Sequence, residues 1–140
     1  MAATAEVSQE RVISAPLEEV RAFLLDPEEA ASLTPDVESV EVLTSDTCDL
    51  VRTTNKGLLS SVEYVVKRCY ADDGVQETLV ESEDFTAYEA SYTLTAVDGG
   101  TKVVYDVTVG VDMPVPDWAI RMGVERSTAA TMEALAAHFD

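Results

Sequence analysis

The sequence predicts an α+β domain in which a curved antiparallel sheet of about seven strands wraps around a long C-terminal helix. From residue 37 to residue 112, apolar residues recur with a period of two and are interrupted by short turn sequences. After Pro116 there is no further proline, and Ala, Met, Leu, Glu and Arg dominate, as in a helix. A helix of this length with a wide apolar face needs a cover, and we expect the preceding strands to supply it.

The N-terminal part of the chain predicts one strand and two short helices. Residues 4–13 alternate weakly and form the expected strand, which a Ser-Ala-Pro sequence ends. Apolar residues then recur at helical spacing through Asp26, which indicates the first helix. Asp26 can cap a second helix at residues 27–33, because Pro27 occupies its first position and Glu29 has the capping-box spacing.

The middle of the chain predicts six consecutive strands. They cover about residues 37–45, 47–54, 62–71, 75–82, 85–97 and 101–112. Short turns between them imply antiparallel neighbours, and Asp98-Gly99-Gly100 is the best hairpin signal in the chain. The turn before residue 62 has two possible positions, Asn55-Lys56-Gly57 and Ser60-Ser61.

The final helix has an unusual first half. Its apolar arc covers about 200° of the helical wheel and includes Trp118 and Met122, but also the charged residues Arg121 and Glu125. Such a pair either lines the mouth of a cavity, where it would orient a polar ligand end, or projects into water beyond the sheet. Gly123 costs helix stability relative to alanine, and either close approach to the sheet or room for a ligand would explain it.

The charge balance excludes several classes of partner. The chain has 27 acidic and 9 basic residues, for a net charge of −18. Such a surface repels nucleic-acid phosphates and anionic lipid headgroups, so neither is an expected partner. The acidic residues are spread along the whole chain, which favours the solvated shell of a halophilic protein over an acidic face for a basic partner. The sequence does not indicate an oligomeric state.

The expected compartment and the expected cofactors are inferred from sequence features that are absent. No run of 18 apolar residues predicts a membrane span, and the first residues do not resemble a signal peptide, so we expect a cytoplasmic protein. In that setting Cys48 and Cys69 are expected to be two thiols rather than a disulfide. His138 is the single histidine, and no glycine-rich phosphate loop occurs, so neither a metal nor another cofactor is expected.

Several motifs, in order along nearly the whole chain, carry a family resemblance. They are Ile13-Ser14-Ala15-Pro16-Leu17-Glu18-Glu19-Val20, Leu25-Asp26-Pro27, Thr34-Pro35-Asp36-Val37 and Asp98-Gly99-Gly100-Thr101-Lys102-Val103. With the C-terminal helix, they make the chain resemble the START-like helix-grip superfamily, also called SRPBCC, which includes polyketide cyclases, plant pathogenesis-related proteins and lipid-transfer domains. Ala31-Ser32-Leu33 stands where a tryptophan often follows the first helix pair. The resemblance implies one START-like ligand-binding domain over residues 1–140, with a cavity between sheet and helix for an apolar ligand.

The sequence offers a suitable lining for such a cavity. Side chains with apolar bodies, most of them with polar tips, fall on faces predicted to point inward, and the charged pair of the last helix completes the predicted ligand-binding set. These residues are Tyr64, Tyr88, Tyr92, Tyr105, Trp118, Arg121, Met122 and Glu125. The alternative is that the aromatic residues simply fill a core. The charged strand residues Arg52, Arg68, Glu89 and Asp106 are expected on the outer sheet face, although Arg68 shares the parity of Val66 and Tyr70 and could enter the cavity.

These observations favour binding or carriage of a small hydrophobic molecule, such as a lipid, an isoprenoid or a polyketide-like compound. One alternative is an enzyme of the cyclase or dehydratase kind that uses the same cavity, with Glu125 and a tyrosine for acid–base work. Another is a stress-response or regulatory module with a small pocket. No Ser-His-Asp or Cys-His arrangement occurs, so the sequence assigns no catalytic residue.

Overall fold

A computed structural model describes residues 2–56 and 60–140 of the chain. Its strands are β1 (Ala2–Ile13), β2 (Val37–Ser45), β3 (Cys48–Lys56), β4 (Ser61–Ala71), β5 (Gly74–Ser82), β6 (Phe85–Val97) and β7 (Gly100–Asp112), and its helices are α1 (Leu17–Leu25), α2 (Pro27–Ala31) and α3 (Asp117–His138). The order of elements is the predicted one. The turn between β3 and β4, for which two positions were open, falls largely on residues 57–59, outside the described residues.

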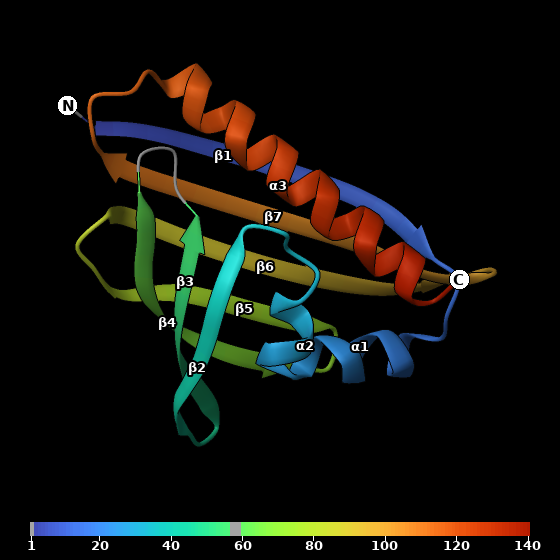
Figure 1. Cartoon of the computed structure of the whole chain (residues 1–140). Helices are drawn as coiled ribbons and strands as arrows, with labels where there is room; N and C mark the ends of the chain where they lie inside the picture. Colours follow the sequence, from blue (N-terminus) through green and yellow to red (C-terminus); the bar gives the residue numbers. More distant parts are fainter. Residues whose placement is uncertain (1, 57–59) are drawn as a thin grey trace.

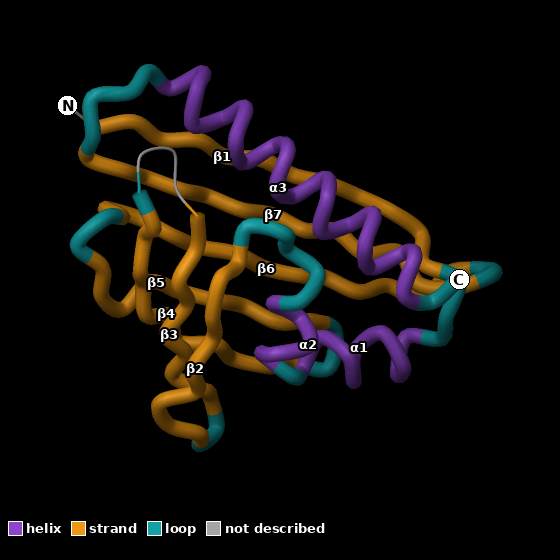
Figure 2. Tube along the Cα trace, in the orientation of Figure 1, coloured by secondary structure: helices purple, strands orange, loops and turns teal. Residues whose placement is uncertain are grey.

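The seven strands form one antiparallel sheet in the order β1-β7-β6-β5-β4-β3-β2. The first strand, β1, lies at one edge of the sheet and pairs with the last strand, β7, and Figure 1 shows α3 lying along both. The other two helices lie together beneath the C-terminal end of α3, as the trace in Figure 2 shows. This arrangement leaves room for a cavity over the concave face of the sheet, between α3 and the strands β3 to β6.

Local sequence signals explain most of the element boundaries. The Asp26 carboxylate accepts hydrogen bonds from the backbone of Glu28 and Glu29, at 2.9 and 3.3 Å, and so caps α2 as predicted. Gly99 takes the left-handed φ of 86° that the β6–β7 hairpin requires. Along β7 every second side chain is buried in the concave face: Val103, Tyr105, Val107, Val109 and Val111.

A disulfide between Cys48 and Cys69 overturns the prediction of two thiols. The two cysteines are directly opposite each other in the β3–β4 register, with 4.4 Å between their Cα atoms. This separation lies within the range that a disulfide can bridge. The prediction failed because it considered the expected compartment and not the pairing of the strands, which depends on a turn that the sequence left open.

None of the helices in the described parts of the chain combines the length and apolar character needed to cross a membrane.

Candidate ligand-binding cavity

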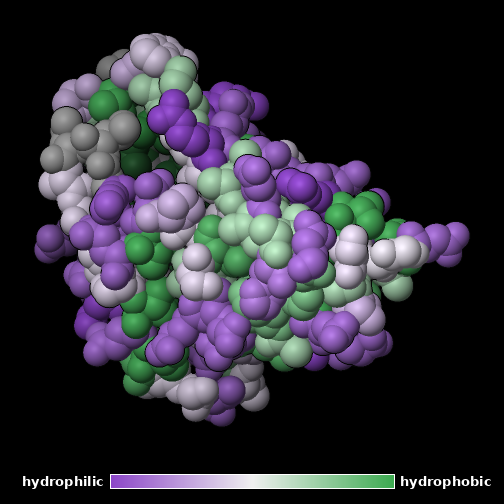
Figure 3. All heavy atoms as spheres, turned by 45° about the vertical axis from the view of Figure 1, so that its right-hand side comes forward, coloured by the Kyte–Doolittle hydropathy of each residue, from purple (hydrophilic) through white to green (hydrophobic). Residues whose placement is uncertain are grey.

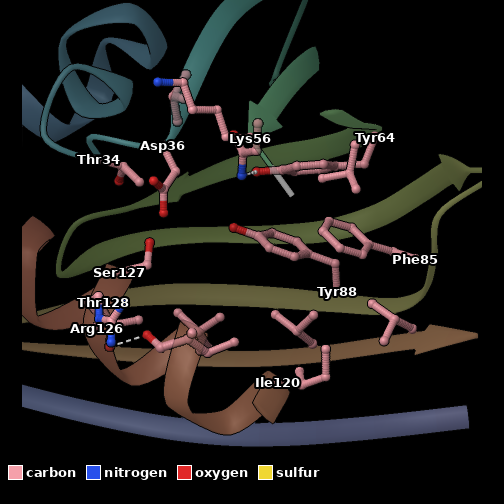
Figure 4. A pocket seen from close by; sticks show the side chains of 18 of the residues that line it. Thr34, Asp36, Lys56, Tyr64, Phe85, Tyr88, Ile120, Arg126, Ser127 and Thr128 are labelled. Carbon is pink, nitrogen blue, oxygen red and sulfur yellow. Dashed lines mark hydrogen bonds between the residues drawn. The ribbon is translucent and has the colours of Figure 1, made fainter. Parts of the chain in front are cut away.

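A cavity of about 370 Å³ lies between α3 and the concave face of the sheet. Its base is apolar and comes mainly from β7 and α3, through Val107, Val109 and Ile120. Phe85 and Tyr88 form an aromatic side, as Figure 4 shows. In the space-filling view of Figure 3, a recess with apolar side chains at its base opens at the upper left of a face that carries both hydrophilic and hydrophobic residues. We call the cavity of about 370 Å³ the outer chamber.

The rim of the outer chamber is polar and is built from three separate segments. Thr34 and Asp36 come from the loop before β2, Lys56 from the end of β3, and Arg126 and Ser127 from α3. Two contacts hold the loop in place. The hydroxyl groups of Thr34 and Thr131 are 2.8 Å apart, and the backbone NH of Lys56 donates to the carbonyl of Asp36 at 2.8 Å. These contacts position the loop between the sheet and α3.

A smaller inner chamber of about 50 Å³ lies deeper, toward α2. It shares Thr34, Val37, Tyr64, Tyr88 and Tyr105 with the outer chamber, so these side chains divide two neighbouring spaces. A water molecule occupies about 30 Å³ of liquid volume, so the inner chamber has room for only a very small group.

The four predicted tyrosines all line this pair of chambers. The rings of Tyr92 and Tyr105 are stacked, with 4.2 Å between their centroids, and those of Tyr64 and Tyr88 are 4.7 Å apart. Burial is the main cause that raises the pKa of each of the four hydroxyl groups well above its ordinary value. All four are therefore neutral at physiological pH and can donate or accept hydrogen bonds.

Arg68 lines the inner chamber together with Glu77, which corrects the expectation that Arg68 lies on the outer face. Its side chain is only 1% exposed. Nε donates to Glu77 at 3.0 Å, Nη2 donates to the carbonyl of Leu24 at 2.6 Å, and the guanidinium lies 5.5 Å from the centre of the Tyr70 ring. Nη1 is buried and has no hydrogen-bond partner. Arg68 and Val66 are two residues apart in β4, so their side chains point to the same, inward face. This alternation predicts the position of Arg68 correctly, whereas its charge does not.

The other three charged strand residues, Arg52, Glu89 and Asp106, do lie on the outer face. Glu89 and Asp106 are exposed. Arg52 keeps 41% of its side-chain surface in water, where it pairs with Glu41. Arg68 differs because Glu77 and a helix carbonyl are available inside to receive its hydrogen bonds.

Two acidic residues lie near Arg68: Glu77, whose own pKa is raised, and Asp49, which contributes to raising the pKa of Tyr70. Burial raises the pKa of Glu77, although the adjacent Arg68 charge acts in the opposite direction. Asp49 accepts hydrogen bonds from the hydroxyl groups of Tyr70 and Ser45. Burial, followed by the hydrogen bond to Asp49, raises the pKa of Tyr70 to about 12.

The raised pKa of Glu77 predicts a specific pH dependence. The folded protein retains this proton to higher pH than the unfolded chain, so the contribution of Glu77 to the free energy of unfolding is largest below the ordinary carboxyl value of 4.5 and falls as pH rises through the raised pKa. The stability of the wild type relative to Glu77→Gln should therefore decline as pH rises above about 4.5, as measured by urea unfolding. The control is Glu81→Gln, an exposed position on the same strand, for which the difference should stay flat. A flat difference for Glu77→Gln as well would contradict the assignment.

The predicted site residues of α3 do not line either chamber. Trp118 and Met122 are 66% and 50% exposed, so the prediction that they face inward is wrong. Arg121 and Glu125 pair with each other at 3.0 Å, and each keeps more than half of its side chain in water. Of the two predicted alternatives, the pair therefore follows the second: it projects into water and does not line the mouth of a cavity.

The first half of α3 is rotated relative to the predicted arc. Ile120 and Val124 do face the cavity, and the positions beside them in the lining are Gly123 and Ser127, while Trp118 and Met122 of the predicted arc lie in water. A Cβ atom at Gly123 would meet nothing within 4 Å. The open space agrees with the explanation that this glycine leaves room for a ligand. It does not agree with the explanation that the helix approaches the sheet closely at this position.

Asn55 is a lining residue that the sequence did not suggest. It lies in β3 with the same parity as the buried residues Val51 and Thr53. Of the two predicted turn positions, a turn at Ser60-Ser61 extends the strand through Asn55, whereas a turn at Asn55-Lys56-Gly57 places Asn55 in the turn, so the alternation alone did not assign it to the lining.

Comparison with known proteins identifies the family. The profile of the family described as "Polyketide cyclase / dehydrase and lipid transport" matches residues 4–140. The chain belongs to this family. A comparison with curated proteins finds no match.

Solved structures of similar proteins share the architecture of this family member. A START superfamily protein from Mycobacterium smegmatis has a TM-score of 0.83 and 17% identity, with 96% of each chain covered. The Zhui aromatase/cyclase from Streptomyces sp. R1128 has a TM-score of 0.82 and 16% identity, with 96% of this chain and 93% of that chain covered. A protein from Thermus thermophilus has a TM-score of 0.80 and 24% identity, with 94% of each chain covered. At these identities the likeness shows the fold, which is the predicted helix-grip arrangement.

Proposed function

We propose that this protein binds a small, largely apolar molecule in the outer chamber and holds one acceptor group of that molecule at Arg68. The observation that carries the proposal is the buried Nη1 of Arg68, which has no hydrogen-bond partner within the protein and belongs to a residue that lines the inner chamber, next to the apolar outer chamber. A buried donor without a partner costs free energy, and a ligand oxygen would remove that cost. The cavity volume of about 370 Å³ lies at the small end of the range for ligand pockets.

The two chambers restrict the ligand. The apolar base and aromatic side of the outer chamber suit a lipid, an isoprenoid or a polyketide-like ring compound. The inner chamber admits only a group as small as a ketone or a carboxylate. An arginine donor prefers such an oxygen, and most strongly a charged one. The proposed ligand is therefore apolar over most of its length and carries a small oxygen acceptor at one end.

One arrangement favours catalysis as a second candidate function. Arg68 pairs with Glu77, whose pKa is raised by burial, and Tyr92 and Tyr105 line the same inner chamber. Arg68 would polarise a carbonyl of the ligand, and Glu77 would carry the proton that a cyclisation or dehydration must move. The aromatase/cyclase from Streptomyces has this fold, which agrees with the candidate but does not decide between binding and catalysis.

A substitution at the mouth of the outer chamber tests the binding proposal. Gly123 lines the chamber, is exposed, and has open space around its Cβ position. In Gly123→Phe the new ring should occupy this space and weaken binding of the probe 6-methoxy-2-naphthoic acid at least about tenfold by calorimetry, which corresponds to about 1.4 kcal/mol. The fold should be retained, because position 123 is exposed and a Cβ atom there meets no other atom within 4 Å.

The matched control is Gly123→Ala. It should raise the free energy of unfolding by about 0.8–1.0 kcal/mol, as alanine favours a helix more than glycine does, and leave probe binding unchanged. Equal probe affinities in the wild type and Gly123→Phe would mean that the ligand does not occupy the outer chamber.

A further inference from the structure

Two buried polar atoms distinguish the cavity from the rest of the described chain. Among the described residues, the buried side-chain nitrogen and oxygen atoms without a hydrogen-bond partner are Asn55 Oδ1 and Arg68 Nη1. Arg68 lines the inner chamber and Asn55 the outer chamber. Native proteins satisfy nearly all buried polar groups, so two exceptions on residues that line adjoining chambers are candidates for groups that a ligand satisfies.

The position of Asn55 is fixed by its strand and by Tyr64. Its Nδ2 donates to the Tyr64 hydroxyl at 3.3 Å, the bond drawn to Tyr64 in Figure 4. Tyr64 lines both chambers and stays neutral, because burial raises its pKa. One end of the Asn55 amide is therefore tied to the wall between the chambers, and the other end has no partner.

The chemistry of the amide indicates what it would bind. An amide group can rotate by 180° and exchange its oxygen and nitrogen, and the Tyr64 hydroxyl can accept from the one or donate to the other. In one orientation the free end is an acceptor, and in the other it is a donor. A hydroxyl group satisfies both orientations because it donates and accepts, whereas an ether or a ketone satisfies only the second.

We infer that Asn55, held by Tyr64, is a specificity-determining residue that binds a hydroxyl group of the ligand in the outer chamber. This inference rests on the proposed function and extends it, because Arg68 then binds an acceptor group while Asn55 binds a hydroxyl group. The ligand class is a ring compound with a small carbonyl or carboxylate group at one end and a hydroxyl group on its body.

A pair of probe molecules that differ at one group tests the inference. Both 6-hydroxy-2-naphthoic acid and 6-methoxy-2-naphthoic acid carry a carboxylate on a planar apolar body, but only the first has a hydroxyl group to donate. The wild-type protein should bind the hydroxy compound about tenfold more tightly, as measured by calorimetry. In Asn55→Leu, which has a similar volume and no polar atoms, the two affinities should become equal.

Two further variants keep the test decisive. Asn55→Ala cannot overfill the chamber and should show the same loss of preference if Asn55→Leu does not fold. Thr54→Val removes a hydroxyl from the neighbouring position of β3, which lines neither chamber, and should leave the tenfold preference intact.

The outcomes separate this inference from the proposal beneath it. A preference that is present in the wild type and Thr54→Val but lost in both Asn55 variants supports the inference. Equal binding of the two probes by the wild type, or a preference that survives without Asn55, overturns the inference and leaves the proposed function standing. A wild-type protein that binds neither probe overturns the proposed function, and this inference with it.

Discussion

Arg68→Met is expected to lower the free energy of unfolding by about 3 kcal/mol, at the lower end of the roughly 3–5 kcal/mol seen when one member of a buried ion pair is removed. The lower end applies because Glu77, the partner left behind, keeps 25% of its side-chain surface in water. The variant also loses the hydrogen bond to the Leu24 carbonyl, which joins β4 to the end of α1. Urea unfolding monitored by far-UV circular dichroism measures the change.

The double variant Arg68→Met, Glu77→Met separates charge from packing. Replacing both members of a buried pair with apolar side chains is often neutral or stabilising, so the double variant should recover most of the stability that Arg68→Met loses. It should nevertheless not bind 6-methoxy-2-naphthoic acid, because no donor remains for the carboxylate. A double variant that binds the probe like the wild type would show that Arg68 serves the fold and not the ligand.

This result would explain why the pair is present. A buried ion pair is weak evidence for stability, since apolar residues of the same size do as well. The Arg68–Glu77 pair lies beside the deepest part of a cavity and leaves one guanidinium nitrogen without a partner. A pair kept for stability would have satisfied that nitrogen within the protein. The ion pair is better understood as a preorganised recognition group whose own carboxylate holds it in position.

The fold could be predicted because its signals are local. Alternation along β7 and the turn at Gly99 specify strand and hairpin without knowledge of the neighbouring strands. The Asp26 cap and the helical spacing before it specify the paired helices in the same way. The tyrosines of the cavity followed from the same alternation, since strand parity decides which face a side chain points to.

The residues that the sequence placed wrongly depend on long-range geometry. In α3 the wheel gave a broad apolar arc, but contact with β1 and β7 fixed the rotation of the helix and left Trp118 in water. The charge of Arg68 favours solvent whereas its parity favours the interior, and its half-buried partner Glu77, which decides between them, lies on the next strand. Hydrophobicity predicts burial on average, but a buried charge is decided by its partners.

Removal of the Cys48–Cys69 disulfide is the second change with a large expected effect. The bond closes a loop with a sequence separation of 21 residues. In the chain-entropy description, a loop of this size restricts the unfolded state enough to contribute about 3 kcal/mol to stability. The double variant Cys48→Ala, Cys69→Ala should therefore lose about that amount under oxidising conditions, measured by urea unfolding.

The same experiment with a dithiol reductant provides the control. Reduction breaks the S–S bond, gives two protein thiols and oxidises the reductant, so the wild type should lose stability by a similar amount while the double variant stays unchanged. Wild-type stability that does not respond to reductant would show that the cysteines are unpaired in the protein. Cys69 directly follows Arg68 in β4, yet the ion pair and the Leu24 contact hold Arg68 independently of the disulfide. Probe binding by the folded double variant should therefore stay within about twofold of the wild type, which separates a stabilising crosslink from a part of the binding site.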